Sequence, residues 1–255
     1  MNPSQQTILI TGGGSGIGRA LAEAFHARGS KVIIAGRRQA ALDPVTRAHP
    51  GMASLVLDIG SPAAIRDFAS RLLAQHPALN AVIHNAGIMR AEQLRAGDGH
   101  LADAEATVAT NLLGPIRLNA ALLPHLLAQP SATIMTVSSG LAFIPAAAFP
   151  TYCATKAAVH SYTESLRYQL RETKVEVIEL APPYVQTELI GPHQATDPRA
   201  MPLAAFITET MQLLSQTPTP PEILVEPVKP LRFAAKGDYP AFFKTFNDAL
   251  AANPH

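Results

Sequence analysis

The sequence contains a single cysteine, no tryptophan, only 5% aromatic residues and only 15% charged residues. One cysteine cannot form an internal disulfide, and no CxxC pair of the kind found in metal and redox sites is present. The nine histidines show neither HExxH nor HxxxH spacing. We therefore expect neither a disulfide framework nor a metal centre.

The sequence also has no large excess of one charge, because its 20 Lys and Arg residues nearly balance its 19 Asp and Glu residues and give a formal net charge of +1. Without a basic surface, general nucleic-acid binding is not expected. No apolar run approaches the roughly 18–20 residues that a membrane-spanning helix needs, and no basic segment followed by an apolar one opens the sequence. These absences predict a cytoplasmic protein with neither a nucleic-acid nor a membrane partner.

What the sequence does contain is a regular alternation of short apolar segments and helical ones. The expected strands are Thr7–Ile10, Lys31–Ala35, Leu55–Leu57, Ala81–His84, Thr133–Val137 and Val175–Leu180. The clearest helical segments are Pro62–Gln75, Asp103–Ala128 and Thr151–Glu172. This order predicts the α/β class, as a three-layer, Rossmann-like, doubly wound parallel sheet of six or seven strands with helices on both faces. With no internal repeat or linker, we expect one domain over residues 1–255.

The end of the sequence differs from the rest, because ten of its 22 prolines fall between Pro182 and Pro230. Prolines interrupt regular elements and stiffen loops. One interpretation is a surface insertion. The one we favour is a substrate lid over about 184–228, because binding loops follow the carboxyl ends of the strands in open α/β sheets. After it, Leu231–Ala251 is expected to be helical, and no β-branched run ending in glycine follows Val228.

A glycine-rich turn follows the first expected strand and leads into a helix. Five of the seven residues from Gly12 to Gly18 are glycine. Glycine lets the backbone approach a pyrophosphate closely, and a helix N-terminus offers free N–H groups and partial positive charge. A purely structural turn would not need so many glycines. The spacing is not the usual GxGxxG, but it predicts a dinucleotide site that includes Gly12, Gly14, Ser15, Gly16, Ile17 and Gly18.

The end of the second strand indicates which dinucleotide is bound. An NAD site places a carboxylate there for the ribose hydroxyl, whereas this strand runs into Arg37 and Arg38. Guanidinium groups bind a phosphate bidentately. We therefore predict NADP(H) over NAD(H), with Arg37 as the main contact and Arg38 as the second. The alternative is that one or both arginines are solvated surface charges.

Tyr152 and Lys156 are four residues apart in an expected helix, so they share a face. A free phenol has a pKa near ~10, which is too high for acid–base work at neutral pH. A lysine ammonium about 5 Å away favours the phenolate by roughly 3 kcal/mol, or about 2 pK units. Ser139 ends the fifth expected strand, where its hydroxyl can donate to a substrate carbonyl oxygen.

Asn111 lies in the long helix before that strand, four residues ahead of Pro115. Proline has no N–H, so the Asn111 carbonyl loses its helical partner. The freed carbonyl could hold a water beside Lys156 and open a proton route to solvent. The alternative is a simple helix kink with the carbonyl facing bulk water.

Taken together, these residues resemble the short-chain dehydrogenase/reductase family in its single-domain branch. The resemblance spans residues 7 to about 190, and Ala132–Pro183 looks most like the DltE-type oxidoreductases. The residues that carry it are Thr11, Gly12, Gly16, Gly18, Asp58, Asn85-Ala86-Gly87, Asn111, Ser139, Tyr152 and Lys156. Three positions depart from the family pattern: His84 replaces an asparagine, Pro183 replaces a glycine, and the usual seventh strand has no evident counterpart.

The resemblance implies a role for each of these positions. Tyr152 would be the general acid/base, Lys156 would bind the nicotinamide ribose and tune Tyr152, Ser139 would position the carbonyl, and Asn111 would support a water. Further cofactor contacts would come from Asp58, Ile59, Asn85, Ala86, Gly87, Pro182, Val185 and Thr187.

The expected substrate pocket is apolar, and its candidate residues are Phe143, Phe149, Tyr184 and Leu189. Arg199 is the only Lys or Arg between Ala181 and Val228, which argues against a strongly anionic carrier thioester. We expect a neutral, fairly hydrophobic ketone, aldehyde or secondary alcohol. The alternative is that these apolar residues only close the core.

Two functions remain open on the sequence. The first is an NADP(H)-dependent oxidoreductase in which hydride passes between nicotinamide and a carbonyl carbon while Tyr152 transfers the proton. The second is an NADP(H)-binding sensor without turnover, which would not need an intact Asn-Ser-Tyr-Lys set. A sugar-nucleotide epimerase would use the same Tyr and Lys but usually needs a larger C-terminal domain. Small residues along the helix that carries Tyr152, together with the resemblance, suggest a homodimer or homotetramer.

Overall fold

In the computed structural model, seven parallel strands form one sheet in the order β3-β2-β1-β4-β5-β6-β7. The structure describes Met1 and residues 3–252. The strands are β1 Thr7–Thr11, β2 Lys31–Gly36, β3 Ala53–Val56, β4 Ala81–His84, β5 Ala132–Val137, β6 Val175–Leu180 and β7 Glu222–Ile223. The helices are α1 Gly16–His26, α2 Gln39–Ala48, α3 Pro62–Gln75, α4 Leu101–Val108, α5 Gly114–Ala128, α6 Pro150–Gln169, α7 Leu203–Leu214, α8 Lys229–Arg232 and α9 Tyr239–Ala252.

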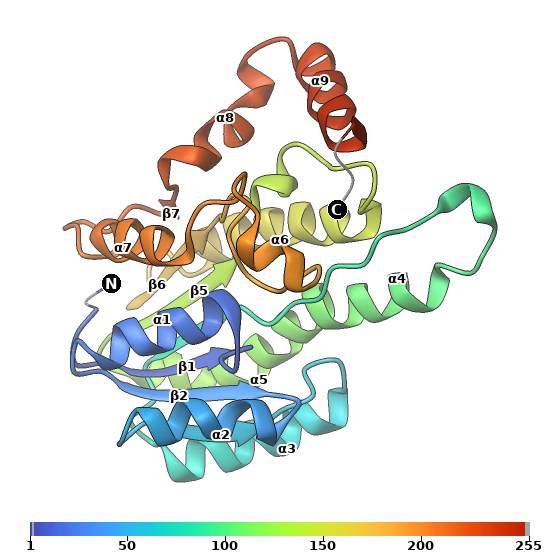
Figure 1. The fold of residues 1–255 in the computed structure, drawn as a ribbon. Helices are drawn as coiled ribbons and strands as arrows, with labels where there is room; N and C mark the ends of the chain where they lie inside the picture. Colours follow the sequence, from blue (N-terminus) through green and yellow to red (C-terminus); the bar gives the residue numbers. More distant parts are fainter. Residues whose placement is uncertain (2, 253–255) are drawn as a thin grey trace.

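Helices cover both faces of the sheet because successive strand residues point to opposite sides. Ile8 and Ile10 face one side, in a buried cluster with residues of α1, α2 and α7. Leu9 faces the other side, in a cluster with residues of α3, α5 and α6. The expected three-layer, doubly wound arrangement is confirmed, and Figure 1 shows the layers.

The strand order reverses between β1 and β4, which both pair with their neighbours in parallel. Such a reversal separates the loops that leave neighbouring strands and opens a crevice at the carboxyl ends. β1 leads into the glycine turn, and β4 leads into Asn85. The two segments with the strongest sequence motifs therefore meet at this crevice.

The long helix expected over Asp103–Ala128 is divided by a π-helical turn, Ala109–Leu113, between α4 and α5. The backbone N–H of Gly114 donates to the carbonyl of Ala109, five residues back. Pro115 lacks an N–H, which disfavours a continuous α-helical ladder here. The helix is thus interrupted at Asn111, and the interruption has the form of a π-helical turn.

The last part of the chain departs most from the expected pattern. A seventh strand exists, but it is only Glu222–Ile223 and lies before Val228, paired with the end of β6. The helical segment expected over Leu231–Ala251 is interrupted after α8 and resumes as α9. Figure 1 shows α8 and α9, in orange-red and red, rising away from the sheet, and Phe246 and Leu250 of α9 pack against a cluster that includes Tyr152 and Cys153 of α6.

The segment 184–228 divides into two parts in the structure. Its first part, up to Arg199, lines the large cavity described below. Its second part contains α7, whose Phe206, Met211 and Leu214 are buried in the core cluster beside α1. Of the segment expected to form a substrate lid, only residues 184–199 therefore lie at the cavity.

Candidate functional site

A cavity of about 630 Å³ opens at the carboxyl ends of the strands. One side, which we call the glycine-turn side, is formed by Gly12, Ser15, Gly16, Ile17, Arg37, Arg38, Asn85, Ala86 and Gly87. The other side, which we call the C-terminal side, is formed by Met89, Arg90, Leu141, Ala146, Phe149, Tyr184, Leu189, Ile190, Arg199, Phe246 and Leu250. Ser139, Tyr152 and Lys156 also line the cavity, as do Pro182, Val185 and Thr187.

The glycine turn is shaped by close packing of the backbone. Gly12 and Gly16 have φ angles of +69° and +53°, in the region where glycine is favoured. A Cβ atom on Gly18 would lie 2.3 Å from the Asn85 amide nitrogen and 2.4 Å from the Gly12 carbonyl oxygen. The Ser15 side chain makes no capping hydrogen bond at the start of α1. The N-terminus of α1 therefore meets the cavity as backbone, the arrangement that binds an anion.

Thr11 and Asn85 tie this turn to the neighbouring strand. The Thr11 hydroxyl accepts hydrogen bonds from the backbone N–H groups of Asn85 and Ala86, at 3.0 and 3.1 Å. In return, Asn85 Nδ2 donates to the Thr11 carbonyl at 3.0 Å. The two loops on either side of the strand reversal are thus held as one unit, and Asn85 both shapes the turn and lines the cavity.

The end of β2 brings two positive charges to the glycine-turn side. Arg37 and Arg38 both line the cavity, and both are exposed. No carboxylate is among the lining residues on this side. The local charge therefore favours a group more negative than a ribose hydroxyl.

Tyr152 and Ser139 meet where β5 ends and α6 begins. Both side chains are buried, with exposed fractions of 7% and 8%. Burial raises the pKa of the Tyr152 phenol, and its hydrogen bond with the Ser139 side chain lowers that pKa in part. Ser139 also accepts a hydrogen bond from the backbone N–H of Leu141 at 3.1 Å, which fixes its hydroxyl in the cavity wall.

Lys156 lies beneath Tyr152 on the same face of α6, with its Nζ atom 5.6 Å from the centre of the phenol ring. Nζ donates to the Val137 carbonyl at 2.8 Å. Burial lowers the pKa of Lys156 to about 8, while the charge of Glu179 raises it. The ammonium thus lies near the phenol ring, on the helix face that the four-residue spacing predicts.

From this spacing we expected the phenol of Tyr152 to have a lowered pKa. In the protein without bound cofactor, its pKa is raised instead. Burying a phenolate is unfavourable, and this burial has the largest effect on the pKa of Tyr152, which it raises. The spacing of Tyr152 and Lys156 alone does not include this effect.

Asn111 is fixed by the loop that follows β4. Its Oδ1 accepts from the Ile88 N–H at 2.9 Å, and its Nδ2 donates to the Ile88 carbonyl at 2.9 Å. Nδ2 also donates to the Thr155 hydroxyl at 3.3 Å. The side chain thus joins the π-helical turn, the loop after β4 and helix α6, and does not line the large cavity.

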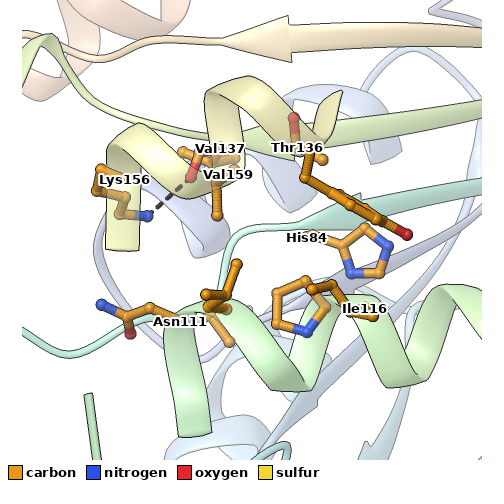
Figure 2. Close-up of a pocket in the computed structure, with 11 residues that line it drawn as sticks. His84, Asn111, Ile116, Thr136, Val137, Lys156 and Val159 are labelled. Carbon is orange, nitrogen blue, oxygen red and sulfur yellow. Dashed lines mark hydrogen bonds between the residues drawn. The ribbon is translucent and has the colours of Figure 1, made fainter. Parts of the chain in front are cut away.

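A second, much smaller cavity of about 10 Å³ lies behind Lys156, between Asn111, Thr136 and His84. Figure 2 shows these side chains around it, with the Lys156–Val137 hydrogen bond dashed. His84 Nε2 donates to Asn119 Oδ1 at 2.7 Å, and the Nδ1 atom has no partner among the described residues. Burial lowers the pKa of His84 to about 4, so the ring is neutral. At the position where the family pattern has asparagine, this chain thus has a buried ring nitrogen that can accept a hydrogen bond, on the same small cavity as Lys156.

Several residues expected at the site do not line the large cavity. They are Gly14, Gly18, Asp58, Ile59, Asn111 and Phe143. Gly14 faces Ala41 of α2, and Asp58 is exposed and accepts from the N–H of Gly60. Phe143 packs edge-on against His160, with its ring centre 4.8 Å away.

The contribution of the C-terminal helix to the cavity was not predicted from the sequence. Phe246 and Leu250 of α9 line the cavity, as do Met89, Arg90, Leu141 and Ile190. The spacing of Phe246 and Leu250 on one face of an expected helix was visible, but no local signal shows which part of the fold that face covers. Phe149, Tyr184 and Leu189 do line the cavity.

One group of side chains has metal-ligating types, although we expected no metal centre. Single ligand atoms of His160, Glu179 and Glu222 lie within 4.8 Å of one another. His160 Nδ1 is 2.8 Å from Glu179 Oε2, and Arg232 Nη2 is 2.9 Å from Glu222 Oε1. The guanidinium supplies the positive charge that a bound cation would bring, so the group is an ion-pair network joining α8 to the sheet edge.

A membrane span is not found either: within the described part of the chain, no helix combines the length and the apolar character needed to cross a bilayer.

Comparison with known proteins gives this site a context. A sequence model described as short chain dehydrogenase matches residues 6–198. The uncharacterized oxidoreductase DltE of Bacillus subtilis (strain 168) is 37% identical over 250 residues, which cover 97% of this chain and 98% of that protein.

Solved structures agree with this chain at the level of the fold. A short chain dehydrogenase/reductase from Burkholderia phymatum, in complex with NAD, has a TM-score of 0.80 at 21% identity and covers 100% of this chain and 98% of its own. A short chain dehydrogenase from Burkholderia cenocepacia J2315, in complex with NADP, also has a TM-score of 0.80, at 23% identity, covering 96% and 98%.

Proposed function

The chain belongs to the short-chain dehydrogenase/reductase family, and from that premise we propose that it is an NADP(H)-dependent oxidoreductase acting on a neutral, hydrophobic carbonyl or secondary alcohol. The observation that carries this proposal is the convergence of Ser139, Tyr152 and Lys156 on one cavity with the glycine turn. A binding protein without turnover does not need a buried phenol beside a buried lysine.

The glycine-turn side fits a dinucleotide. Side chains at Gly12 or Gly18 would collide with neighbouring backbone, so the turn keeps its backbone open to a ligand. We place the pyrophosphate at the N-terminus of α1 and the ribose phosphate at Arg37, with Arg38 as the second contact. The two solved relatives hold different cofactors, so the preference for NADP(H) depends on these two arginines. When bound, the cofactor would supply or accept the hydride.

The chain's own catalytic residues manage the proton and the carbonyl oxygen. Because burial raises the pKa of Tyr152, its phenol is protonated in the protein alone and suits donation to a carbonyl oxygen. Ser139 holds that oxygen by donating from its hydroxyl. Lys156, held by Val137, is positioned to stabilise the phenolate left after the proton moves. Asn111 supports this arrangement through Ile88 and Thr155.

The proposed setting is a cytoplasmic homodimer or homotetramer. The outer face of α6 has the exposed small residues Ala154, Ala157, Ser161 and Ser165, which allow a second helix to approach closely. Sedimentation at micromolar concentration should give a dimer or tetramer. A monomer under those conditions would contradict this part of the proposal.

The function is tested by following oxidation of NADPH with a panel of ketones, aldehydes and quinones. We expect turnover with at least one apolar carbonyl compound. Tyr152→Phe keeps the packing of the ring and removes the proton, so kcat should fall by about 10³-fold. The Kd for NADPH should change little.

An unchanged rate in the variant would remove the role given to Tyr152. Tight NADPH binding without turnover of any compound would favour the sensor over the enzyme.

A further inference from the structure

Helix α9 forms part of the wall around the catalytic tyrosine. Phe246 and Leu250 are four residues apart, so they lie on the same face of the helix. Both pack against a small cluster that contains Phe149, Tyr152 and Cys153. The same two side chains line the large cavity. The C-terminal helix is therefore packed against the cluster that contains the catalytic tyrosine.

The position of α9 is set by specific hydrogen bonds as well as by apolar contact. Asn247 Oδ1 accepts from the backbone N–H of Ala147 at 2.7 Å. Asn247 Nδ2 donates to the Pro145 carbonyl at 3.1 Å. This one side chain pairs with two backbone groups of the loop before α6, a hundred residues away in the chain. It holds Phe246, its neighbour in the chain, at a fixed place against the cavity.

Between the tyrosine and α9, the lining is apolar. The side chains there are Met89, Leu141, Ala146, Phe149 and Ile190. The polar residues nearby are already engaged. The Tyr184 hydroxyl donates to Asp197 at 3.1 Å, and Gln194 donates to the Val185 carbonyl at 2.8 Å. This side of the cavity therefore favours hydrocarbon over charged groups.

Glu188 and Arg199 also line the cavity, and the charged residue that could favour an anionic substrate here is Arg90. It is exposed and donates to the Met89 carbonyl at 3.2 Å. Arg199, the other arginine, forms an ion pair with Asp197 at 2.7 Å. A substrate with a terminal carboxylate would exploit Arg90, so such compounds belong in the test.

We propose that Phe246 and Leu250 close the substrate end of the cavity and set the length of an unbranched apolar chain attached to the reacting carbonyl. This inference rests on the proposed function, which it deepens by naming the substrate class and the specificity-determining residues. Each additional buried CH₂ group should improve kcat/KM by roughly fourfold until the chain meets α9.

The experiment measures kcat/KM with NADPH for methyl ketones of increasing chain length. In the wild-type protein, kcat/KM should rise with length and then stop rising. Phe246→Ala and Leu250→Ala should move that limit to longer chains, by about two or more CH₂ groups. Phe246→Trp, which keeps an aromatic ring and adds bulk, should move it to shorter chains.

The matched control is Phe243→Ala. This phenylalanine is in the same helix but stacks on Tyr239, with ring centres 6.3 Å apart, and does not line the cavity. The length limit should be unchanged in this variant. If Phe246→Ala, Leu250→Ala and Phe246→Trp all kept the wild-type limit, the inference would be overturned. It would also be overturned if keto acids of the same lengths were consistently better substrates than the methyl ketones.

A binding measurement separates this inference from the proposed function. Calorimetric titration of the same ketones in the presence of NADP⁺ gives a length limit that does not depend on turnover. If Phe246 sets the chain length that binds but no ketone is reduced, the enzyme proposal fails and the role of Phe246 in setting chain length stands. If ketones are reduced with the same length limit in every variant, the proposed oxidoreductase activity stands and the role of Phe246 and Leu250 in setting chain length fails. If no ketone binds or reacts, the inference fails.

Discussion

The two sides of the large cavity are built in different ways. On the glycine-turn side, the turn itself presents backbone that Thr11 and Asn85 bond to the neighbouring strand, and Arg37 and Arg38 form a charged edge. On the C-terminal side, the surface consists of side chains from a loop and from α9, and Phe246 and Leu250 are only half-buried. Substitutions leave the backbone groups of the glycine turn in place, whereas each substitution on the C-terminal side changes the shape of the cavity. The first suits a ligand common to many enzymes, and the second suits the selection of a substrate.

The largest effect is expected at the end of β4, which leads into Asn85 of the glycine-turn side and should respond strongly to acid. His84 is 3% exposed, and burial lowers its pKa to about 4 from an ordinary 6.5. As the pH falls, the unfolded chain binds a proton at His84 before the folded protein does. The contribution of neutral His84 to the free energy of unfolding is therefore fully present above pH 6.5 and is lost as the pH falls toward 4. The loss is on the order of 3 kcal/mol. Urea unfolding across this pH range measures it.

The control for this prediction is His84→Asn, which has no titrating group. Its unfolding free energy should fall less steeply between these pH values, whatever its absolute stability. Equal slopes in the two proteins would show that His84 is not the group responsible.

A methyl group added to the glycine turn should sharpen the comparison further. In Gly18→Ala, the new Cβ would lie 2.3 Å from the Asn85 amide and must displace it. Overpacking of this kind costs about 2 kcal/mol of stability and should also weaken NADPH binding. Gly99→Ala is the control, because nothing lies within 4 Å of its added Cβ. Thermal unfolding and NADPH titration should separate the two variants, and Phe246→Ala should bind NADPH like wild type.

The charged edge of the glycine-turn side should select between cofactors. Arg37→Ala removes a guanidinium from the cavity wall, so the KM for NADPH should rise about tenfold while that for NADH stays nearly constant. Arg38→Ala should have a smaller effect of the same kind. Steady-state kinetics with both cofactors tests this, and equal effects on the two would contradict the assignment of the phosphate to Arg37.

The smallest effect is expected where the C-terminal side is attached. Asn247→Ala removes two hydrogen bonds to the loop before α6, and at this half-buried position we expect each bond to contribute about 0.5 kcal/mol, or about 1 kcal/mol together. Amide exchange within α9 should accelerate about fivefold, with global unfolding nearly unchanged. Thr245→Ala, at an exposed position of the same helix, should leave exchange as in wild type. An unchanged α9 in Asn247→Ala would indicate that apolar packing alone holds it.

Much of the fold could be predicted because its signals are local. The strand Val175–Leu180 and the helix Pro62–Gln75 have the expected bounds, and in the structure the Ser61 side chain caps the helix. The π-helical turn at Asn111 has a local cause in Pro115, but proline predicts only an interruption, not its geometry. The two-residue strand β7 is too short for any periodicity and forms only because β6 offers it a partner.

The site was predictable to a similar degree. The spacing of Tyr152 and Lys156 follows from helical geometry, so the two residues meet as expected. The pKa of the phenol did not follow, because burial by Phe149, Cys153 and α9 is a property of the assembled protein. Phe143 was expected in the cavity with Phe149, but only Phe149 lines it. Apolar character alone does not tell which way a loop residue points.

By itself, the sequence determined the alternation of strands and helices, the glycine turn, the two arginines after β2 and the catalytic spacing on α6, because each depends on neighbours within one or two turns of the chain. Only the tertiary structure decided that the C-terminal helix closes the cavity, that His84 is buried and neutral behind Lys156, and that α7 belongs to the core. These features depend on contacts between segments up to a hundred residues apart, and such contacts are selected by packing over the whole molecule.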